Sequence, residues 1–350
     1  ITATAVATLD GNGIDSTVSI TNGGRGYTPS STTIPVTFSA PPTGTTATGV
    51  ANSDVNGVIT SITVTNPGSG YTIAPTITIG DPLPLPTDIA GIQGLNVDLD
   101  SENGFTQSGV ITAMSLDVTN TVAGDVELDQ NNDVGTVAIT NTLGDVTYNT
   151  NRATVTDIAG IQGMNVDLDS ENGFTQSAAI TATSLDVTNT VAGNVVLDQN
   201  NDVGIVAITN AVGDVTYNTN RGTTTDIAGI QGMNVDLDSE NGFTQSGAIT
   251  ATSLDVTNTV DGDVVLDQNN DVGTVAITNT VGDVTYTTIS SSKTDIAGIQ
   301  GVNIALNTDN GVSQSAAITA TNSLTVTNAV SGNVVLDQNN DVAIVAITNA

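Results

Sequence analysis

Three carboxylates alternate with other side chains in the sequence VDLDSENGFTQSG, which occupies residues 97–109. Asp98, Asp100 and Glu102 would lie on one face of a strand and the turn that follows it, because alternate side chains of a strand share a face. Oxygen ligands at this density could bind a divalent cation. Two carboxylates at a suitable separation could instead hydrolyse a glycosidic bond.

The acidic sequence is repeated, and its repetition bears on whether its carboxylates could be catalytic. Copies begin at Val166 and Val235, and a divergent copy, IALNTDNGVSQSA, begins at Ile304. The equivalent acidic residues are Asp167, Asp169, Glu171, Asp236, Asp238, Glu240 and Asp309. A hydrolase built from them would carry three or four identical active sites, so the repetition predicts a structural role and no catalytic residue.

A second acidic sequence, LDQNND, offers Asp129, Asn131 and Asp133 at alternate positions. Its copies begin at Leu128, Leu197, Leu266 and Leu336. The start resembles a calcium-binding loop, but Gly135 comes one residue late and Thr140 stands where a bidentate Glu is required. A turn whose Asn and Asp side chains bind their own backbone is the alternative. Calcium is therefore the candidate ion at both acidic sequences, and no cofactor is required.

Composition excludes several classes of function. The 350 residues include 36 acidic and four basic side chains, a net charge of −32, so no nucleic acid is expected as a partner. The absence of Cys and His removes thiol nucleophiles, imidazole bases and the usual zinc sites. No apolar run approaches the roughly 20 residues of a membrane span, so no membrane insertion is expected.

Proline divides the chain. All nine prolines lie at or before Pro86, and DPLPLPTD at residues 81–88 predicts a stiff, extended linker over residues 81–87. Residues 1–80 contain two copies of one unit, at about 1–42 and 43–80, with Tyr27 and Tyr71 at equivalent positions. Each copy predicts a small antiparallel β module. The tyrosines could stack on sugars or fill small cores, and the second role is the expectation.

Residues 88–350 form a strict repeat. TDIAGIQG begins at Thr87, Thr156, Thr225 and Thr294, at a constant interval, so four 69-residue repeats start near 88, 157, 226 and 295. Each repeat divides into three related segments, and each segment contains three short strands, which describes an all-β chain wound as a parallel β-helix. About twelve coils would make a rod of roughly 58 Å. A propeller is the competing architecture, but it needs longer blades and aromatic anchors.

Alternation within the segments predicts which side chains face inward. Leu95, Val97 and Leu99 would share the inner face. Stacked coils would place Val97, Val118 and Ile139 in one interior column, with Asp98, Thr119 and Thr140 facing solvent. Asparagines that end equivalent strands predict a ladder of stacked amides at a coil corner. They are Asn120, Asn141, Asn189, Asn210, Asn258, Asn279, Asn328 and Asn349.

Two further patterns have alternative interpretations. Thr119-Asn120-Thr121 and Thr140-Asn141-Thr142 resemble the Thr-x-Thr rows of ice-binding solenoids, but acidic residues interrupt the column every third coil. Arg152 and Arg221 stand at equivalent positions of successive repeats, and Ser290 is the third equivalent. A salt bridge at a coil corner or a solvated turn accounts for both arginines.

The repeats resemble a known family. GFTQSG at residues 104–109, ITATSLDVTNT from Ile180 and VVLDQNNDVG from Val195 are similar to the repeats of filamentous-haemagglutinin-like secreted exoproteins. The resemblance covers residues 87–350, about three quarters of the chain, and implies a right-handed parallel β-helix exported as an adhesin or surface fibre. The Gly-x-Gly-Tyr modules resemble those of large structural proteins of marine bacteria and their phages.

The sequence therefore predicts a non-enzymatic structural or adhesive protein, located outside the cell or on its surface. A phage tail fibre or other virion component is the alternative. A polysaccharide-processing β-helix would need a unique cleft with an unrepeated acid pair, which the sequence does not contain. The end of the sequence, AIVAITNA at residues 343–350, stops within a coil. The expected partners are therefore further repeats or copies of the chain bound head to tail, together with cell-surface glycans.

Overall fold

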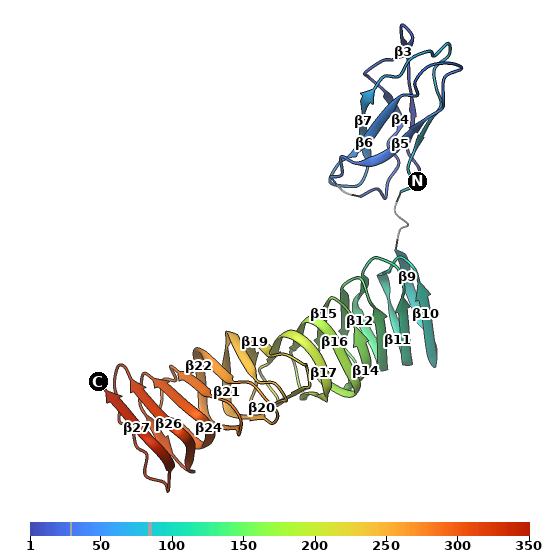
Figure 1. Ribbon diagram of the computed structural model, residues 1–350. Helices are drawn as coiled ribbons and strands as arrows, with labels where there is room; N and C mark the ends of the chain where they lie inside the picture. The colour runs from blue at the N-terminus through green and yellow to red at the C-terminus, as the bar shows by residue number, and fades with distance from the viewer. Residues whose placement is uncertain (29, 83–85) are drawn as a thin grey trace. The chain divides into compact units, whose positions relative to one another are not determined.

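A computed structural model describes residues 1–28, 30–82 and 86–350 (Figure 1). The chain divides at the proline-rich segment into two compact units, and the second runs from Pro86 to Ala350. Of the predicted linker, residues 83–85 lie outside the described residues, and Thr87 already belongs to a strand. Each unit is described by itself.

The first unit consists of short antiparallel strands around one core. The strands are β1 (Thr4–Val6), β2 (Leu9–Asp10), β3 (Gly13–Ile14), β4 (Ser19–Asn22), β5 (Ile34–Phe38), β6 (Thr48–Ser53), β7 (Ile59–Asn66) and β8 (Ile77–Ile79). β1 pairs with β4, β2 with β3, and a four-stranded sheet has the order β7-β6-β5-β8. Buried side chains from both copies of the unit belong to a single cluster, so the two copies fold around a shared core.

Tyr27 and Tyr71 occupy equivalent places in that core. Their exposed fractions are 3% and 4%, and their hydroxyls accept hydrogen bonds from the backbone N–H groups of Ala3 (2.7 Å) and Ala47 (2.9 Å). The expectation that the tyrosines fill a β core is confirmed. Buried rings cannot serve as stacking platforms for sugars.

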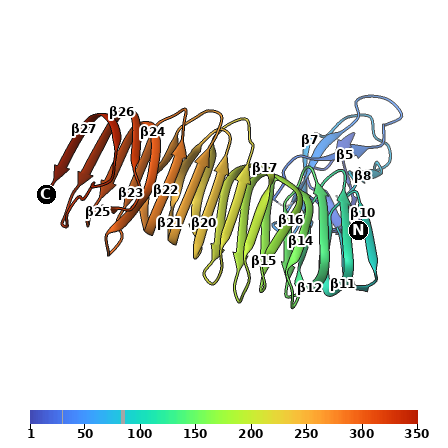
Figure 2. The ribbon, with the colours of Figure 1, turned by 90° about the horizontal axis from the view of Figure 1, so that it is seen from below.

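The second unit is a solenoid of 19 strands in one sheet, and all of their pairings are parallel (Figure 2). Its first repeat contains β9 (Thr87–Gln93), β10 (Asn96–Ser101), β11 (Phe105–Asn120), β12 (Val126–Asn141) and β13 (Val146–Thr150). The second contains β14 (Thr156–Gln162), β15 (Asn165–Ser170), β16 (Phe174–Asn189), β17 (Val195–Asn210) and β18 (Val215–Thr219). The third contains β19 (Thr225–Gln231), β20 (Asn234–Ser239), β21 (Phe243–Asn258), β22 (Val264–Asn279) and β23 (Val284–Thr288). The fourth contains β24 (Thr294–Thr308), β25 (Val312–Gln314), β26 (Ile318–Asn328) and β27 (Asp341–Asn349).

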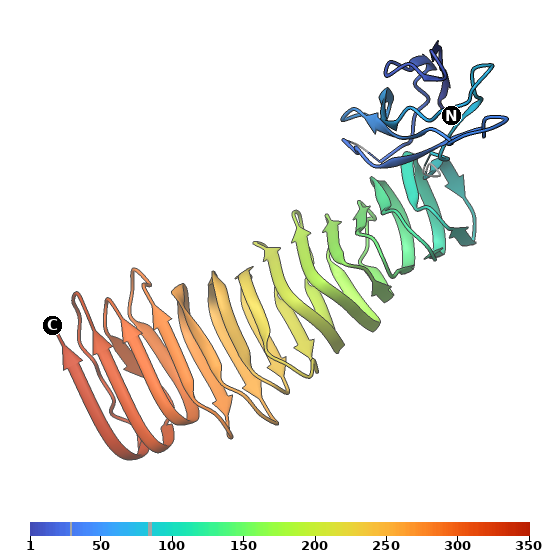
Figure 3. The ribbon, with the colours of Figure 1, turned by 45° about the horizontal axis from the view of Figure 1, so that its top comes forward.

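The predicted parallel β-solenoid is confirmed, but the number of coils per repeat is not three. Paired residues in successive coils are 18 to 22 positions apart, as in Ile158 with Gln176 and Ile277 with Ile299. The solenoid therefore makes about 13 turns rather than twelve. Several strands, such as β11, form one 16-residue element around the coil instead of three separate short strands. Figure 3 shows strands that curve around the coil at the C-terminal end of the solenoid.

Each repeat of the solenoid spans seven half-turns. Val97 pairs with Leu116, which pairs with Val137, and that residue pairs with Ile158. Val166, the repeat equivalent of Val97, belongs to the other column of the coil. That column runs through Phe105, Val126, Val146, Val166 and Leu185. Successive repeats are therefore related by a half-turn, so the same sequence feature alternates between two opposite flanks of the solenoid.

The pairing register also corrects the predicted columns. Val97, Val118 and Ile139 all face inward, with exposed fractions of 8%, 0% and 1%, whereas Asp98 and Thr140 are exposed, as expected. However, the first coil is shorter than the sequence spacing suggested, so Val97 stacks on Leu116 and not on Val118. In consequence Asp98 lies beside Asp117, and Asp100 lies beside Thr119.

Leu95 contradicts the alternation rule. It is 71% exposed, and its equivalents Met164 and Met233 are about half exposed. The backbone explains this, because residue 95 precedes β10 in the bend after Gly94 and its carbonyl accepts hydrogen bonds from Met114 and Ser115. Period-two alternation applies only within a strand.

The core makes a direct prediction about stability. Phe174 is completely buried in the solenoid interior, and Phe174→Ala should lower the free energy of unfolding by about 3–5 kcal/mol because the cavity cannot collapse between stacked coils. Val191 is 60% exposed in a turn, and Val191→Ala should change it by less than about 0.5 kcal/mol. Urea unfolding followed by circular dichroism measures both. Equal effects of the two substitutions would contradict the coil register.

Candidate functional sites on the solenoid

The LDQNND sequence contains a buried amide and not a turn. In the second repeat Asn201 is completely buried within β17, next to exposed Asn200. The Asn201 carboxamide oxygen accepts hydrogen bonds from the Gln176 side chain (2.6 Å) and from the Ile180 N–H (2.8 Å). Its amide nitrogen donates to Gln176 Oε1 (3.2 Å) and to the carbonyls of Leu197 (3.1 Å) and Asn218 (2.9 Å).

This amide pair recurs in every repeat, as Gln107–Asn132, Gln176–Asn201, Gln245–Asn270 and Gln314–Asn340. The register of the pairing between β17 and β18 shifts at residues 197–201. The Asn201 amide binds backbone groups that this shift leaves without a partner strand. The sequence reasoning missed these residues. Their signal was the constant offset between a glutamine and an asparagine, which is the same in the first three repeats.

The eight asparagines predicted to form a corner ladder form separate pairs. Asn120 and Asn141 are buried, and the Asn120 Nδ2 group donates to Asn141 Oδ1 at 3.0 Å. The next coil continues from Thr140 to Gln162 and supplies no further asparagine. The other pairs are Asn189–Asn210, Asn258–Asn279 and Asn328–Asn349, in which Asn349 is exposed. Each pair stabilises one bend, as when Asn120 Oδ1 accepts from the Gly104 N–H (2.8 Å).

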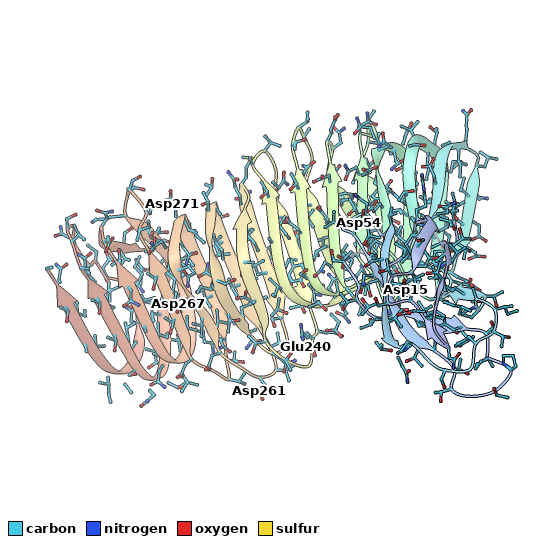
Figure 4. All side chains as sticks on the ribbon, turned by 90° about the horizontal axis from the view of Figure 1, so that it is seen from above. Asp15, Asp54, Glu240, Asp261, Asp267 and Asp271 are labelled. Carbon is cyan, nitrogen blue, oxygen red and sulfur yellow. The ribbon has the colours of Figure 1, made fainter. Side chains whose placement is uncertain are left out.

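The candidate calcium ligands are spread around the solenoid. Asp98, Asp100, Glu102, Asp129, Asn131 and Asp133 are all exposed. Figure 4 shows their third-repeat equivalents, with Glu240 at one edge of the solenoid, Asp267 on its face and Asp271 at the other edge. Among the described residues, no group of three acidic side chains is placed so that it could hold a metal ion. Calcium binding at these positions stays a prediction.

Carboxylates nevertheless gather in pairs where the acidic sequence meets the next coil. Asp167 is paired with Asp186, and Asp169 lies two residues along the same strand. Burial raises the pKa of Asp167 and of Asp169, and the negative charge of Asp186 raises both further. Asp236 and Asp238, with Asp255, repeat the arrangement on the opposite flank.

A surface groove crosses successive coils beside Arg221. We call it the Arg221 groove; it has a volume of about 580 Å³, and its lining includes Gln162, Met164, Thr181, Thr183, Ile205 and Arg221. The Arg221 Nε group donates to Thr223 Oγ1 (2.8 Å) and lies 3.8 Å from Asp202 Oδ1. A Cβ atom at Gly204 would collide with the guanidinium, so the absence of a side chain there lets Arg221 lie against the strand.

Arg152 contacts the equivalent residues one repeat earlier, but through a different nitrogen in the ion pair. Its Nε group donates to Thr154 Oγ1 at 2.7 Å, and Nη1 lies 4.0 Å from Asp133 Oδ1. These contacts are the corner salt bridges that sequence equivalence suggested. Both pairs are substantially exposed, so each contributes at most about 1 kcal/mol to stability.

Comparison with protein-family models, with curated proteins and with solved structures gives no match to this chain. The resemblance to filamentous-haemagglutinin-like repeats therefore stays a prediction. Over the residues that the structure describes, no helix is long and apolar enough to cross a membrane.

The buried amide pair can be tested against its exposed neighbour. Asn201→Ala would leave the Gln176 Nε2 group and the Ile180 N–H without a partner in the interior, and should cost about 2–3 kcal/mol of unfolding free energy. Asn200→Ala removes an exposed amide and should cost less than about 0.5 kcal/mol. Thermal and urea unfolding distinguish them, and a larger loss for Asn200→Ala would contradict the assignment.

The acidic pairs predict that stability rises on mild acidification. The carboxyls of Asp167, Asp169, Asp236 and Asp238 have folded-state pKa values above the value of about 3.9 for an unfolded chain. The folded state therefore binds protons more readily, and the melting temperature should increase as the pH falls from 7 through the raised pKa values towards 4. At pH 7, salt at about 1 M should reproduce only the part of this increase in melting temperature that arises from relief of charge repulsion. A melting temperature that decreases steadily between pH 7 and 5 would contradict this.

Proposed function

We propose that this protein is a non-enzymatic structural and adhesive shaft, the β-solenoid of an extracellular adhesin or surface fibre. The observation that carries the proposal is the single core that runs through all four repeats, from Ile89 to Val326, without a break. Each coil buries its apolar side chains only against its neighbours, so the architecture extends along one axis by adding repeats. A long rigid spacer is the function that this construction serves directly.

The distribution of polar groups supports a non-enzymatic role. Every acidic sequence, buried amide pair and asparagine pair occurs in several copies, and the half-turn between repeats places successive copies on opposite flanks. An active site needs groups that converge on one substrate. Repeated groups on alternating flanks instead suit a shaft that exposes the same side chains on two opposite sides along its length.

The pairing of strands inside the solenoid suggests how it could be extended. Residues 205–209 of β17 pair with residues 226–231 of β19, and the same VAIT and TDIAGIQ sequences meet at the other internal junctions. β27 carries VAITN and pairs with β26, whereas β9 carries TDIAGIQ and pairs with β11. Within the described residues, β27 pairs only with β26 and β9 only with β11, so each has one backbone edge without a partner strand.

We propose that the strand that pairs with the free edge of β27 has the TDIAGIQ sequence, supplied by a further repeat or by β9 of a second copy. Val345 and Ile347 are about half exposed, although their equivalents Val206 and Ile208 are completely buried by the next coil. An internal junction also contains a half-turn such as β18, which a further repeat would provide. Either source continues the apolar columns.

Charged substitutions test the extension. Val345→Lys with Ile347→Lys puts ammonium groups where the next coil must pack, and should abolish filaments formed by the wild-type chain. Ile344→Lys is the control, because its equivalent Ile205 faces outward and is 43% exposed. Negative-stain microscopy and sedimentation velocity measure assembly. A wild-type chain that stays monomeric at high concentration would contradict head-to-tail binding, and filaments in the double variant would contradict the proposed edge.

A further inference from the structure

The Arg221 guanidinium has hydrogen-bonding capacity that the solenoid does not use. Its Nε group binds Thr223, but within the described residues its two terminal nitrogens donate no hydrogen bond to protein. The side chain is one-third exposed, and the separation of 3.8 Å from Asp202 is that of a loose ion pair. A planar fork of N–H groups is therefore directed to a surface groove in a chain that has only four basic residues.

The loop that carries Arg221 is held by hydrogen bonds to its backbone, and the guanidinium lies against the strand beside it. The Arg221 N–H donates to Thr219 Oγ1 (3.4 Å), and the Arg221 carbonyl accepts from Asn241 Nδ2 (2.6 Å). Gly204 provides the space in which the guanidinium lies. A charged group held in place by its own loop loses little conformational freedom when a ligand binds.

The remaining walls of the groove combine hydroxyls with two apolar side chains. Thr181, Thr183 and Thr224 contribute hydroxyls, and each hydroxyl can both donate and accept. Met164 and Ile205 are 48% and 43% exposed and form the apolar part of the lining. A volume of about 580 Å³ lies within the range of small-molecule sites.

The other copies lack this combination. At the first-repeat equivalents of Thr183, Ile205 and Thr224 stand Met114, Thr136 and Val155, so two of the three hydroxyls that surround Arg221 are lost beside Arg152. The third repeat has Ser290 in place of the arginine and Lys293 in place of Thr224, but two backbone contacts of the loop are kept. The Ser290 N–H donates to Thr288 Oγ1 (3.3 Å), and its carbonyl accepts from Asn310. The arginine is therefore not required for the loop to form.

We propose that the Arg221 groove binds a carboxylate-bearing saccharide unit, a uronic acid residue. The guanidinium would receive the carboxylate through its two free nitrogens, because a planar fork matches the two oxygens of a carboxylate. The threonine hydroxyls would bind the sugar hydroxyls, and Met164 and Ile205 would contact the apolar ring face. Asp202 stays near Nε and leaves the terminal nitrogens available to the ligand.

This proposal specifies a ligand class for the adhesive part of the proposed function and rests on it. The net charge of −32 repels long polyanions, so the groove suits a short acidic saccharide and not a polyuronate chain. Because the half-turn between repeats places Arg152 on the opposite flank, where two of the hydroxyls are missing, one molecule should bind one ligand.

The test compares two arginine substitutions that remove contacts to equivalent residues of the solenoid. Digalacturonate, its neutral methyl ester and acetate are titrated against the wild-type chain, Arg221→Ser and Arg152→Ser, with calorimetry and NMR as readouts. We expect one equivalent of digalacturonate to bind the wild type. Arg221→Ser should weaken this binding at least tenfold, and Arg152→Ser should change it less than twofold. The methyl ester and acetate should each bind at least tenfold more weakly.

Serine is found naturally at the equivalent position 290, so both variants are expected to fold, and equal melting temperatures verify this. The proposal is overturned if the wild type does not bind digalacturonate, if both arginine variants lose it equally, or if acetate binds as well as digalacturonate. Monomeric protein is used throughout. Absence of saccharide binding would not contradict the proposed head-to-tail assembly. Absence of filaments would likewise not change the expected binding of digalacturonate.

Discussion

Parallel backbone pairing between successive coils is the constraint on which the solenoid depends. Every strand within the solenoid must pair its N–H and C=O groups with the coil before and the coil after, and paired residues are 18 to 22 positions apart. The length of the sequence repeat is not a whole multiple of this spacing. Each repeat accommodates seven half-turns, and the same sequence must therefore fit both flanks of the coil. This explains why both columns of the interior are built from similar Val, Leu and Ile side chains.

Polar side chains in the interior form hydrogen bonds where the backbone pairing between successive coils is interrupted. Bends and shifts of register leave backbone groups without partners, and an unpaired group in an apolar interior is costly. Asn201 and Gln176 bind each other and the nearby backbone where β17 changes register, and Asn120 binds the bend before Phe105. These Asn and Gln residues therefore stabilise the fold, although side chains of the same types are also common in ligand-binding sites.

Divergence between copies creates the features that could be specific. Arg152, Arg221 and Ser290 stand at equivalent positions, but only Arg221 is surrounded by Thr181, Thr183 and Thr224. Identical copies strengthen the shaft, since each coil packs against its neighbours in the same way. A few substitutions on the outer face can then produce a local site without disturbing the core.

The sequence by itself determined the class of fold, the inward and outward faces within strands, and the equivalence of the four repeats. These follow from local alternation and from a fixed spacing, both of which are properties of the chain alone. It did not determine the coil length, because turns of different length are compatible with the same alternation. Only the tertiary structure showed that Val97 stacks on Leu116 and that Asp167 lies beside Asp186. The Arg221 groove likewise depends on side chains from successive coils, whose neighbours are decided by the pairing register and not by their order in the sequence.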